Sequence, residues 1–307
     1  MILAASGAGY EEIYRTFDWQ IPDRLNMAAQ ACDSWAERDP DRTAIIDLTA
    51  GVRRDVSYAA LRDMAERLAL ALAEGGVQRG DRVGVLRSQD PWCAAAHVAA
   101  WKLGAISVPL FKLFREDALR ARVEDCGARI VVSDGEGAQM LAALDVVALV
   151  PEAVTLPTGR CATADTGADE PGVLIYTSGT TGKPKGALHG HRVLSGHLPG
   201  VALSHDLLGQ PGDCLWTPAD WAWIGGLFDV LMPGLALGVP VVAARMAKFE
   251  VSECLRIIDQ GAVKNVFFPP TALRMLKAEG AGIEGLRSIA SGGETLGAEM
   301  LGWGRQA

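Results

Sequence analysis

Short runs of β-branched residues alternate with amphipathic stretches from about Thr43 onward in this 307-residue chain. Such alternation is typical of α/β proteins, in which helices cover the faces of mostly parallel sheets. The clearest helix is predicted to begin after the cap residue Ser57 and to end at Gly75-Gly76. Its apolar residues recur every three or four positions and therefore share one face; they are Tyr58, Leu61, Ala65, Leu68 and Leu72.

The same patterns predict a series of further elements. The expected strands are residues 82–86, 106–109, 130–133, 146–150, 173–177, 214–217, 239–242, 266–268 and 286–291. The expected helices are residues 91–103, 115–126, 251–259 and 271–278, with two more that begin near His191 and Ile224. Residues 155–171 are rich in Thr, Gly, Pro and Asp without periodicity, which is typical of a linker. We therefore expect two α/β subdomains, residues 1–165 and 166–307.

Composition bears on two questions, which partners the protein can attract and in which cellular compartment it works. The net charge of −8 gives no long-range attraction to nucleic acid or to an anionic membrane surface. The longest apolar stretch, residues 230–244, is shorter than the ~20 residues of a bilayer span. The six cysteines lie far apart, and the N-terminus lacks the layout of a secretory signal. We expect a cytoplasmic protein with reduced thiols.

A loop rich in glycine, hydroxyl residues and lysine follows the expected strand 173–177. From Leu174 to Gly186 the chain reads LIYTSGTTGKPKG. Glycines leave backbone N–H groups accessible, hydroxyls donate hydrogen bonds and lysines offset negative charge, so the pattern predicts a polyphosphate-binding loop. It is not a Walker-type loop, because Thr177 and Pro184 stand where that pattern needs Gly and Ser or Thr. The alternative is a flexible surface turn.

The run from Tyr176 to Gly186 resembles the signature loop of the AMP-forming adenylating superfamily, which includes acyl-CoA synthetases, luciferases and peptide-synthetase adenylation domains. Shorter stretches are similar to this family in the expected order, so the resemblance covers nearly the whole chain. They are Ser57-Tyr58 with Leu61, and residues 80–83, 102–105 and 108–110. It implies an α/β fold with two mostly parallel β-sheets layered with helices, truncated before the family's barrel and C-terminal domain.

The resemblance also implies how the loop would hold ATP. Hydroxyl and lysine side chains would bind the β- and γ-phosphates, with Thr177 and Lys185 as phosphate stabilisers. The loop residues implied in ATP binding are Thr177, Ser178, Gly179, Thr180, Thr181, Gly182, Lys185 and Gly186. Lys183 is expected to be solvated at the loop tip.

The segment from Ser291 to Leu296 is similar to the family's adenine-contacting segment. Paired glycines after a strand allow the backbone to approach a flat base, and polar groups follow beside it. Gly293, Glu294 and Thr295 are therefore expected to bind the nucleotide, and Gly292 the substrate. The alternative is an ordinary strand-to-helix turn with Glu294 in the first helical turn.

Residues 216–227 hold three tryptophans and two glycines. The resemblance to acyl-CoA synthetases puts Trp223, Ile224 and Gly225 where the acyl pocket meets the pantetheine tunnel, whereas Trp216 and Trp221 are expected to be core. Gly225 replaces a bulkier polar residue of acetate-specific members, which favours acids larger than acetate. The corner at residues 267–271 resembles the family's strand-to-helix corner near this pocket, although Pro270 could simply open a helix.

Three histidines, His189, His191 and His197, lie within nine residues of each other. No cysteine or carboxylate stands at matching spacing, so we expect no metal site from them. By the resemblance, His191 or His197 faces the acyl group, and the pattern does not decide between them.

These features point to an AMP-forming acyl-CoA synthetase for an acetyl- to medium-chain carboxylic acid, with ATP, Mg²⁺ and CoA as reactants or cofactor. In that reaction the carboxylate attacks the α-phosphate of ATP to give acyl-AMP and pyrophosphate, and the CoA thiol then displaces AMP. The family's later motifs are missing between residues 296 and 307, so we expect a truncated chain that is poorly active alone, with a separate C-terminal portion as a candidate partner. A non-catalytic module that binds nucleotide or acyl-adenylate, and an unrelated phosphate-binding α/β protein, remain as alternatives.

Overall fold

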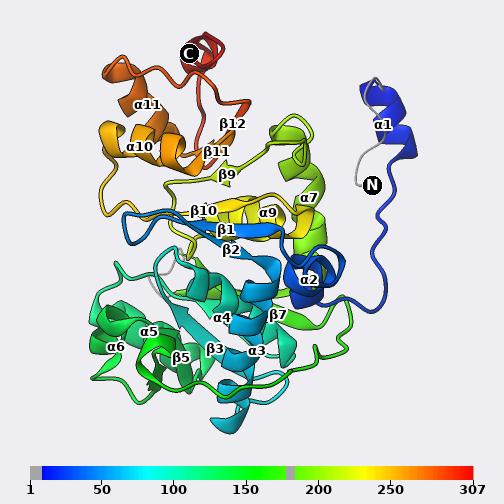
Figure 1. Ribbon diagram of the computed structural model, residues 1–307, viewed down its shortest axis with the longest axis vertical. Helices are drawn as coiled ribbons and strands as arrows, with labels where there is room; N and C mark the ends of the chain where they lie inside the picture. The colour runs from blue at the N-terminus through cyan, green and yellow to red at the C-terminus, as the bar shows by residue number, and fades with distance from the viewer. Residues whose placement is uncertain (1–8, 178–183, 307) are drawn as a thin grey trace.

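The computed structural model describes residues 9–177 and 184–306, and the strands of this part form two six-stranded sheets (Figure 1). The first sheet has the order β12 (Ser288–Ser291), β11 (Asn265–Phe268), β9 (Leu215–Trp216), β10 (Val241–Ala243), β1 (Thr43–Asp47) and β2 (Arg54–Ser57). The second has the order β6 (Val147–Leu149), β5 (Ile130–Ser133), β3 (Arg82–Leu86), β4 (Ile106–Pro109), β7 (Pro171–Thr177) and β8 (Lys185–Gly190). Only the pairs β1–β2 and β7–β8 among these strands are antiparallel, so the expected mostly parallel sheets are confirmed.

Helices fill the space between the sheets and cover their outer faces. Those between the sheets are η1 (Ala29–Asp33), α2 (Ser34–Arg38), α3 (Tyr58–Glu74), α4 (Pro91–Lys102), α7 (Arg192–Ser204) and α9 (Met232–Leu237). The first sheet is covered by α10 (Val251–Gly261), α11 (Pro270–Ala278) and α12 (Ala298–Gly304), and the second by α5 (Glu116–Cys126) and α6 (Gly135–Leu141). Side chains alternate along each strand, so Ile45 packs into the central core and Ile46 into an outer one.

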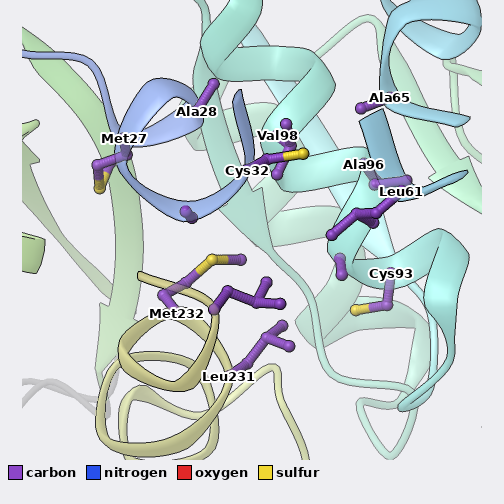
Figure 2. Packing of buried hydrophobic residues seen from close by; sticks show 14 of the residues in the cluster. Met27, Ala28, Cys32, Leu61, Ala65, Cys93, Ala96, Val98, Leu231 and Met232 are labelled. Atoms are coloured by element: carbon purple, nitrogen blue, oxygen red, sulfur yellow. The ribbon is translucent and has the colours of Figure 1, made fainter. Parts of the chain in front are cut away.

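The central core joins segments that lie far apart in the sequence. Leu61 of α3, Ala96 of α4, Leu231 and Met232 belong to one buried cluster, part of which Figure 2 shows, and all four are fully buried. Helix α4 is buried on every side, which explains why its sequence is apolar all round. Its alanines let α3 and strands β3 and β4 approach closely. The buried cluster that contains them includes residues of both sheets, so the two sheets share one continuous core.

Several sequence-based bounds are confirmed. Strands β3, β4 and β5 have the expected limits, and Ser57 caps α3 by accepting a hydrogen bond from the Ala60 N–H at 3.2 Å. Strand β8 was not predicted, and its residues were expected to be loop. The helix expected from Ile224 is divided into α8 (Ile224–Gly226), the π-helical turn η3 (Leu227–Leu231) and α9, with Pro233 at the start of α9.

The segment expected to be a linker is irregular but firmly attached. The N–H of Ala164 donates to the Lys102 carbonyl at 2.8 Å, and Arg24 pairs with Asp165 at 2.8 Å. Both sheets draw strands from each side of residue 165, and the division into two subdomains stays a prediction. The remaining described elements are α1 (Tyr10–Thr16) and the 3₁₀ turn η2 (Pro151–Ala153). Among residues 9–177 and 184–306, none of the helices has the length and apolar character needed to cross a bilayer.

Candidate active site

The expected phosphate loop joins two paired strands. Strands β7 and β8 are antiparallel, with Thr177 opposite Lys185 and Tyr176 opposite Gly186. The Thr177 hydroxyl donates to the Lys185 carbonyl at 3.5 Å, and both side chains are exposed. The loop therefore leaves the carboxyl end of β7, the edge at which α/β sheets bind ligands. The candidate residues Ser178, Gly179, Thr180, Thr181 and Gly182 lie outside the described residues.

Side chains of α5 hold the end of the strand that leads into this loop. The Tyr176 hydroxyl donates to the Asp125 carboxylate of α5 at 2.5 Å. Burial, together with this hydrogen bond, raises the pKa of Tyr176 well above its usual value. The Arg122 guanidinium lies 3.9 Å from the centre of the Phe114 ring and also approaches the Tyr176 ring. These contacts fix the end of β7, so the loop starts from a rigid base.

The expected adenine segment leaves the carboxyl end of β12. Gly293 has φ of +101°, a conformation that favours glycine, so the chain turns sharply there. Glu294 is half-exposed and pairs with Arg274 of α11 at 3.1 Å. Thr295 is exposed beside it.

The ring of Phe267, at the end of β11, connects the adenine segment to the expected acyl segment. A methyl group placed on Gly225 would lie 3.4 Å from Cε1 of this ring, and one placed on Gly292 would lie 3.5 Å from Cε2. The two glycines therefore flank one aromatic ring, although 67 positions separate them in the sequence (292 minus 225). A methyl group at either position would be in ordinary van der Waals contact with the ring, so the backbone of both segments lies near it.

The tryptophan-containing segment begins in β9 of the first sheet and reaches residues that follow strands of the second sheet. Trp216 and Trp221 are fully buried, as expected for core residues, whereas Trp223 and Ile224 are 51% and 43% exposed. The Trp223 ring meets Phe111 edge-on at 5.2 Å between centroids.

Two contacts fix the shape of this loop. The amide of Gln89, which follows β3, donates to the carbonyls of Thr217 and Ala219 at 3.1 and 2.7 Å. Gly226 lies so close to the Asp220 carbonyl that a methyl group there would be 2.3 Å from its oxygen. The loop is therefore tightly held between the second sheet and α8.

A cavity of about 400 Å³ lies between α7 and the ends of β11 and β12. Its lining residues are Gly196, His197, Gly200, Val201, Ser204, His205, Asp229, Phe267, Ala290, Ser291 and Gly292. Within it, Nδ1 of His197 lies 3.0 Å from the Asp229 carboxylate. Its volume is typical of a small-molecule site. Of the histidines considered from the sequence, His197 is the one that lines it.

His191 and His205 are buried and hydrogen-bonded within the fold. Nδ1 of His191 accepts a hydrogen bond from the Met27 N–H at 3.1 Å, and Nδ1 of His205 lies 2.8 Å from the Ser288 hydroxyl. Burial lowers the pKa of each imidazole to about 4, so both are neutral at pH 7. His189 lies on β8. Within the described ranges, no three His, Cys, Asp or Glu side chains are grouped to hold a metal ion.

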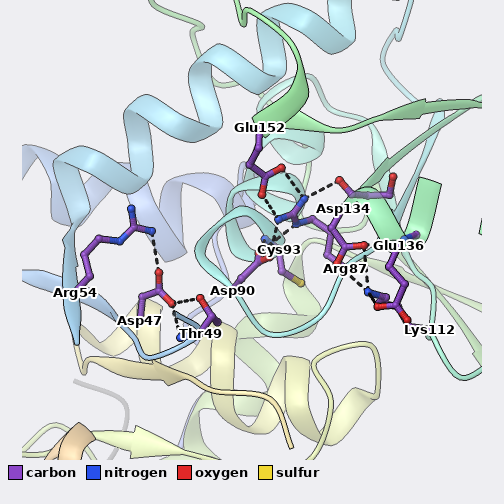
Figure 3. A network of polar contacts seen from close by, with 12 residues as sticks. Asp47, Thr49, Arg54, Arg87, Asp90, Cys93, Lys112, Asp134, Glu136 and Glu152 are labelled. Atoms are coloured by element: carbon purple, nitrogen blue, oxygen red, sulfur yellow. Dashed lines mark hydrogen bonds and ion pairs between the residues drawn. The ribbon is translucent and has the colours of Figure 1, made fainter. Parts of the chain in front are cut away.

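The ends of β3 and β4 carry buried cations that are already paired, and an acid after β5 belongs to the same group of contacts (Figure 3). Arg87, directly after β3, and Lys112, shortly after β4, each have side chains that are 2% exposed. The acids that pair with them are Asp90, Glu152, Asp134 and Glu136. Burial raises the pKa of the Asp90 carboxyl despite its contact with the Arg87 guanidinium. This edge therefore holds a closed network of charges that ties adjacent loops together.

Sequence reasoning missed Asp229, His205 and Gln89. One signal could have found Asp229, because it is the single charged residue in the otherwise apolar run 224–244. An acid within such a run is costly to bury unless it has a partner or a function. Gln89 and His205 carry no comparable signal, since their roles depend on contacts across the fold.

Comparison with known proteins agrees with this geometry. The family of AMP-binding enzymes matches residues 32–307. Acetyl-coenzyme A synthetase of Stutzerimonas stutzeri (strain A1501) is 30% identical, with 96% of this chain and 53% of the relative covered. The corresponding protein of Escherichia coli (strain K12) is 29% identical, with 93% and 50% covered.

Solved structures agree as well. The crystal structure of Brucella canis acyl-CoA synthetase aligns with a TM-score of 0.83 and 26% identity, covering 96% of this chain and 59% of that one. The o-succinylbenzoate CoA synthetase of Bacillus subtilis shares the fold, with a TM-score of 0.79 and 24% identity over 92% of this chain and 56% of that one. The chain spans about half the length of the curated relatives it matches. By the family match over residues 32–307, the chain belongs to the AMP-binding enzyme family.

Proposed function

We propose that this chain carries the ATP-binding and acyl-binding part of an AMP-forming acyl-CoA synthetase. The observation that carries the proposal is the position of Gly225 and Gly292 on either side of the Phe267 ring, because it brings the expected acyl segment near the expected adenine segment. Phe267 and Gly292 also line the cavity. Relatives that cover most of this chain are named acetyl-coenzyme A synthetase. The reaction would convert a small carboxylic acid, ATP and CoA to acyl-CoA, AMP and pyrophosphate.

The chain's own residues would bind and orient the reactants. Attack by the carboxylate gathers negative charge at the α-phosphate, so donors must stand ready around the phosphates. Thr177 and Lys185 emerge side by side at the loop base and would stabilise that charge. The remaining loop groups proposed for ATP are Ser178, Gly179, Thr180, Thr181, Gly182 and Gly186. Gly293, Glu294 and Thr295 would hold the adenine, while Trp223, Ile224, Gly225 and Gly292 would border the acyl group.

Magnesium would enter this reaction with ATP. Mg²⁺ in such sites keeps several waters and binds substrate phosphates through few protein ligands. Among the described residues no three His, Cys, Asp or Glu side chains are grouped together, and we assign none of them to the ion.

In this proposal the whole protein's activity also needs regions that correspond to the part of the relatives outside the match. One of them would be a separate C-terminal portion. We also propose that it works in the cytoplasm, since all six cysteines are free thiols.

The test is calorimetric titration of the 307-residue chain with ATP and with a non-hydrolysable acyl-AMP analogue. Lys185→Ala is expected to weaken ATP binding by about tenfold or more, because a hydrogen bond to a charged group contributes ~1.5–3 kcal/mol. Lys264→Ala is the charge-matched control. Lys264 precedes β11 and so lies at the amino end of that strand, whereas the expected nucleotide segments follow the carboxyl ends of their strands. Equal affinities in the two variants would contradict the role of Lys185.

A parallel assay of CoA ligation separates this proposal from the alternative. Binding of both ligands to the complete protein without any acyl-CoA product would favour a non-catalytic module. Absence of nucleotide binding would exclude both.

A further inference from the structure

The cavity beside Phe267 has an acid, two histidines and two serines among its otherwise apolar or glycine lining residues. One wall is the α7 face with His197, Ser204 and His205, and the opposite wall is the β11–β12 face. Asp229 of η3 lies at its side, 3.0 Å from His197. Burying an alkyl tail here would strip water from a carboxylate and an imidazole without replacing its hydrogen bonds, which is unfavourable.

Helix α7 is shaped to leave this space. Gly196 and Gly200 stand four positions apart, so they lie on the same face of the helix, and both line the cavity. A methyl group on either one would meet no described atom within 4 Å. Glycine weakens a helix interior, and neither position is explained by close packing. The volume in front of α7 is therefore available to a ligand.

The charges in the cavity restrict what that ligand can be. Among the described residues that line it, Asp229 is an acid, and none is a lysine or arginine. The imidazole of His205 is neutral and already bonded to Ser288. His197 uses Nδ1 on Asp229, and its Nε2 has no hydrogen-bond partner in the part of the chain that the structure describes. A hydroxyl or amino group can donate to the carboxylate, whereas a second carboxylate would be repelled by it.

We propose that the acid recognised by this chain carries a hydroxyl or amino group on its tail, and that Asp229, held by His197, is the residue that selects it. This inference rests on the proposed function, since it places the acyl group in the cavity between α7 and the β11–β12 face. Asp229 is in this view a specificity-determining residue. A site built to hydrogen-bond such a group rejects analogues that lack it.

The experiment uses calorimetry of the 307-residue chain with acyl-sulfamoyl-adenosines, which mimic acyl-AMP. Tails of four to eight heavy atoms are compared in matched sets that end in methyl, hydroxyl, amino or carboxylate. We expect the best hydroxyl or amino tail to bind at least about tenfold more tightly than its methyl match, and the carboxylate tail to bind most weakly. Asp229→Leu should remove or reverse this preference, whereas Asp229→Asn should keep most of the preference for hydroxyl.

The control variant is Asp169→Asn, which removes an acidic partner of Arg192 at the exposed start of α7, away from the cavity lining. It should leave the tail preference unchanged. Circular dichroism and sulfamoyl-adenosine without a tail check that each variant folds and binds nucleotide. Tighter binding of the methyl tail at every length, or a preference that survives in Asp229→Leu, overturns the inference while the proposed function stands. Failure of the tail-free analogue to bind the unmodified chain overturns both.

Discussion

The carboxyl ends of the parallel strands carry different chemistry in the two sheets. In the second sheet, β3 and β4 lead to Arg87 and Lys112, which are buried and surrounded by acids. In the first sheet, β11 and β12 lead to Phe267 and Gly292, which border a cavity.

This difference separates charged residues that stabilise the fold from residues that can contact a ligand. A buried charge that is fully paired inside the protein has little left to offer a ligand, and it holds loops together instead. Glycines and a half-buried ring beside a cavity leave space for a ligand. Position at the carboxyl edge of a sheet therefore identifies candidates, and the state of their partners decides which of them can bind.

The largest expected effect tests the closed network. Arg87→Met should lower the free energy of unfolding by about 3 kcal/mol, because it leaves Asp90 and Glu152 without their cation. The value is at the lower end of the range for buried pairs, since Glu152 is 49% exposed and can be hydrated. Urea unfolding followed by circular dichroism measures it.

The control for this variant is Arg53→Met, which breaks an exposed pair with Asp55 and should change stability by less than about 1 kcal/mol. Adding Asp90→Asn to Arg87→Met should recover part of the loss, because asparagine still caps α4 without an unpaired charge. Equal effects of Arg87→Met and Arg53→Met would show that this edge is not a structural network.

The next effect tests the loop that borders the cavity. Gly226→Ala should lower the free energy of unfolding by ~1–3 kcal/mol, because its methyl group would lie 2.3 Å from the Asp220 backbone oxygen and the loop must shift. Gly225→Ala, one position earlier, meets the Phe267 ring at 3.4 Å and should have little effect on stability. Thermal and urea unfolding of the two variants give the comparison, and equal losses would contradict the assigned close approach.

Much of the fold could be predicted from local patterns. Strands such as β5 are continuous β-branched runs, and α3 has a strict helical period with a serine cap, so both follow from short-range sequence. Strand β8 could not be predicted, because Lys185–Gly190 contains two glycines, a lysine and an alanine, all weak strand formers. It forms a strand because β7 is available to pair with it across the loop.

The site was predictable only in part, for a related reason. Gly225 and Gly292 could be chosen as candidates from their local motifs, yet nothing local indicates that both touch Phe267. The pairing of His197 with Asp229 joins residues 32 positions apart on α7 and η3, and it depends on how those helices pack. Long-range packing of this kind leaves no periodic signal in a single sequence.

The smallest expected effect concerns the exposed pair Arg274–Glu294, at the edge that we assign to nucleotide binding. Arg274→Ala should change the free energy of unfolding by less than about 1 kcal/mol, because both side chains are about half-exposed. Arg256→Ala, which breaks a similarly exposed pair with Glu253 on α10, should have the same small effect. Stability alone therefore cannot distinguish the two pairs.

ATP affinity can distinguish them. Arg274 holds the carboxylate of Glu294 at 3.1 Å, so its removal frees a group that we expect to lie beside the adenine. Calorimetry should show a severalfold change in the Kd for ATP with Arg274→Ala and none with Arg256→Ala. If neither variant changes the Kd, Glu294 belongs to an ordinary strand-to-helix turn, and the contrast between the two edges then rests on the cavity and Phe267 alone.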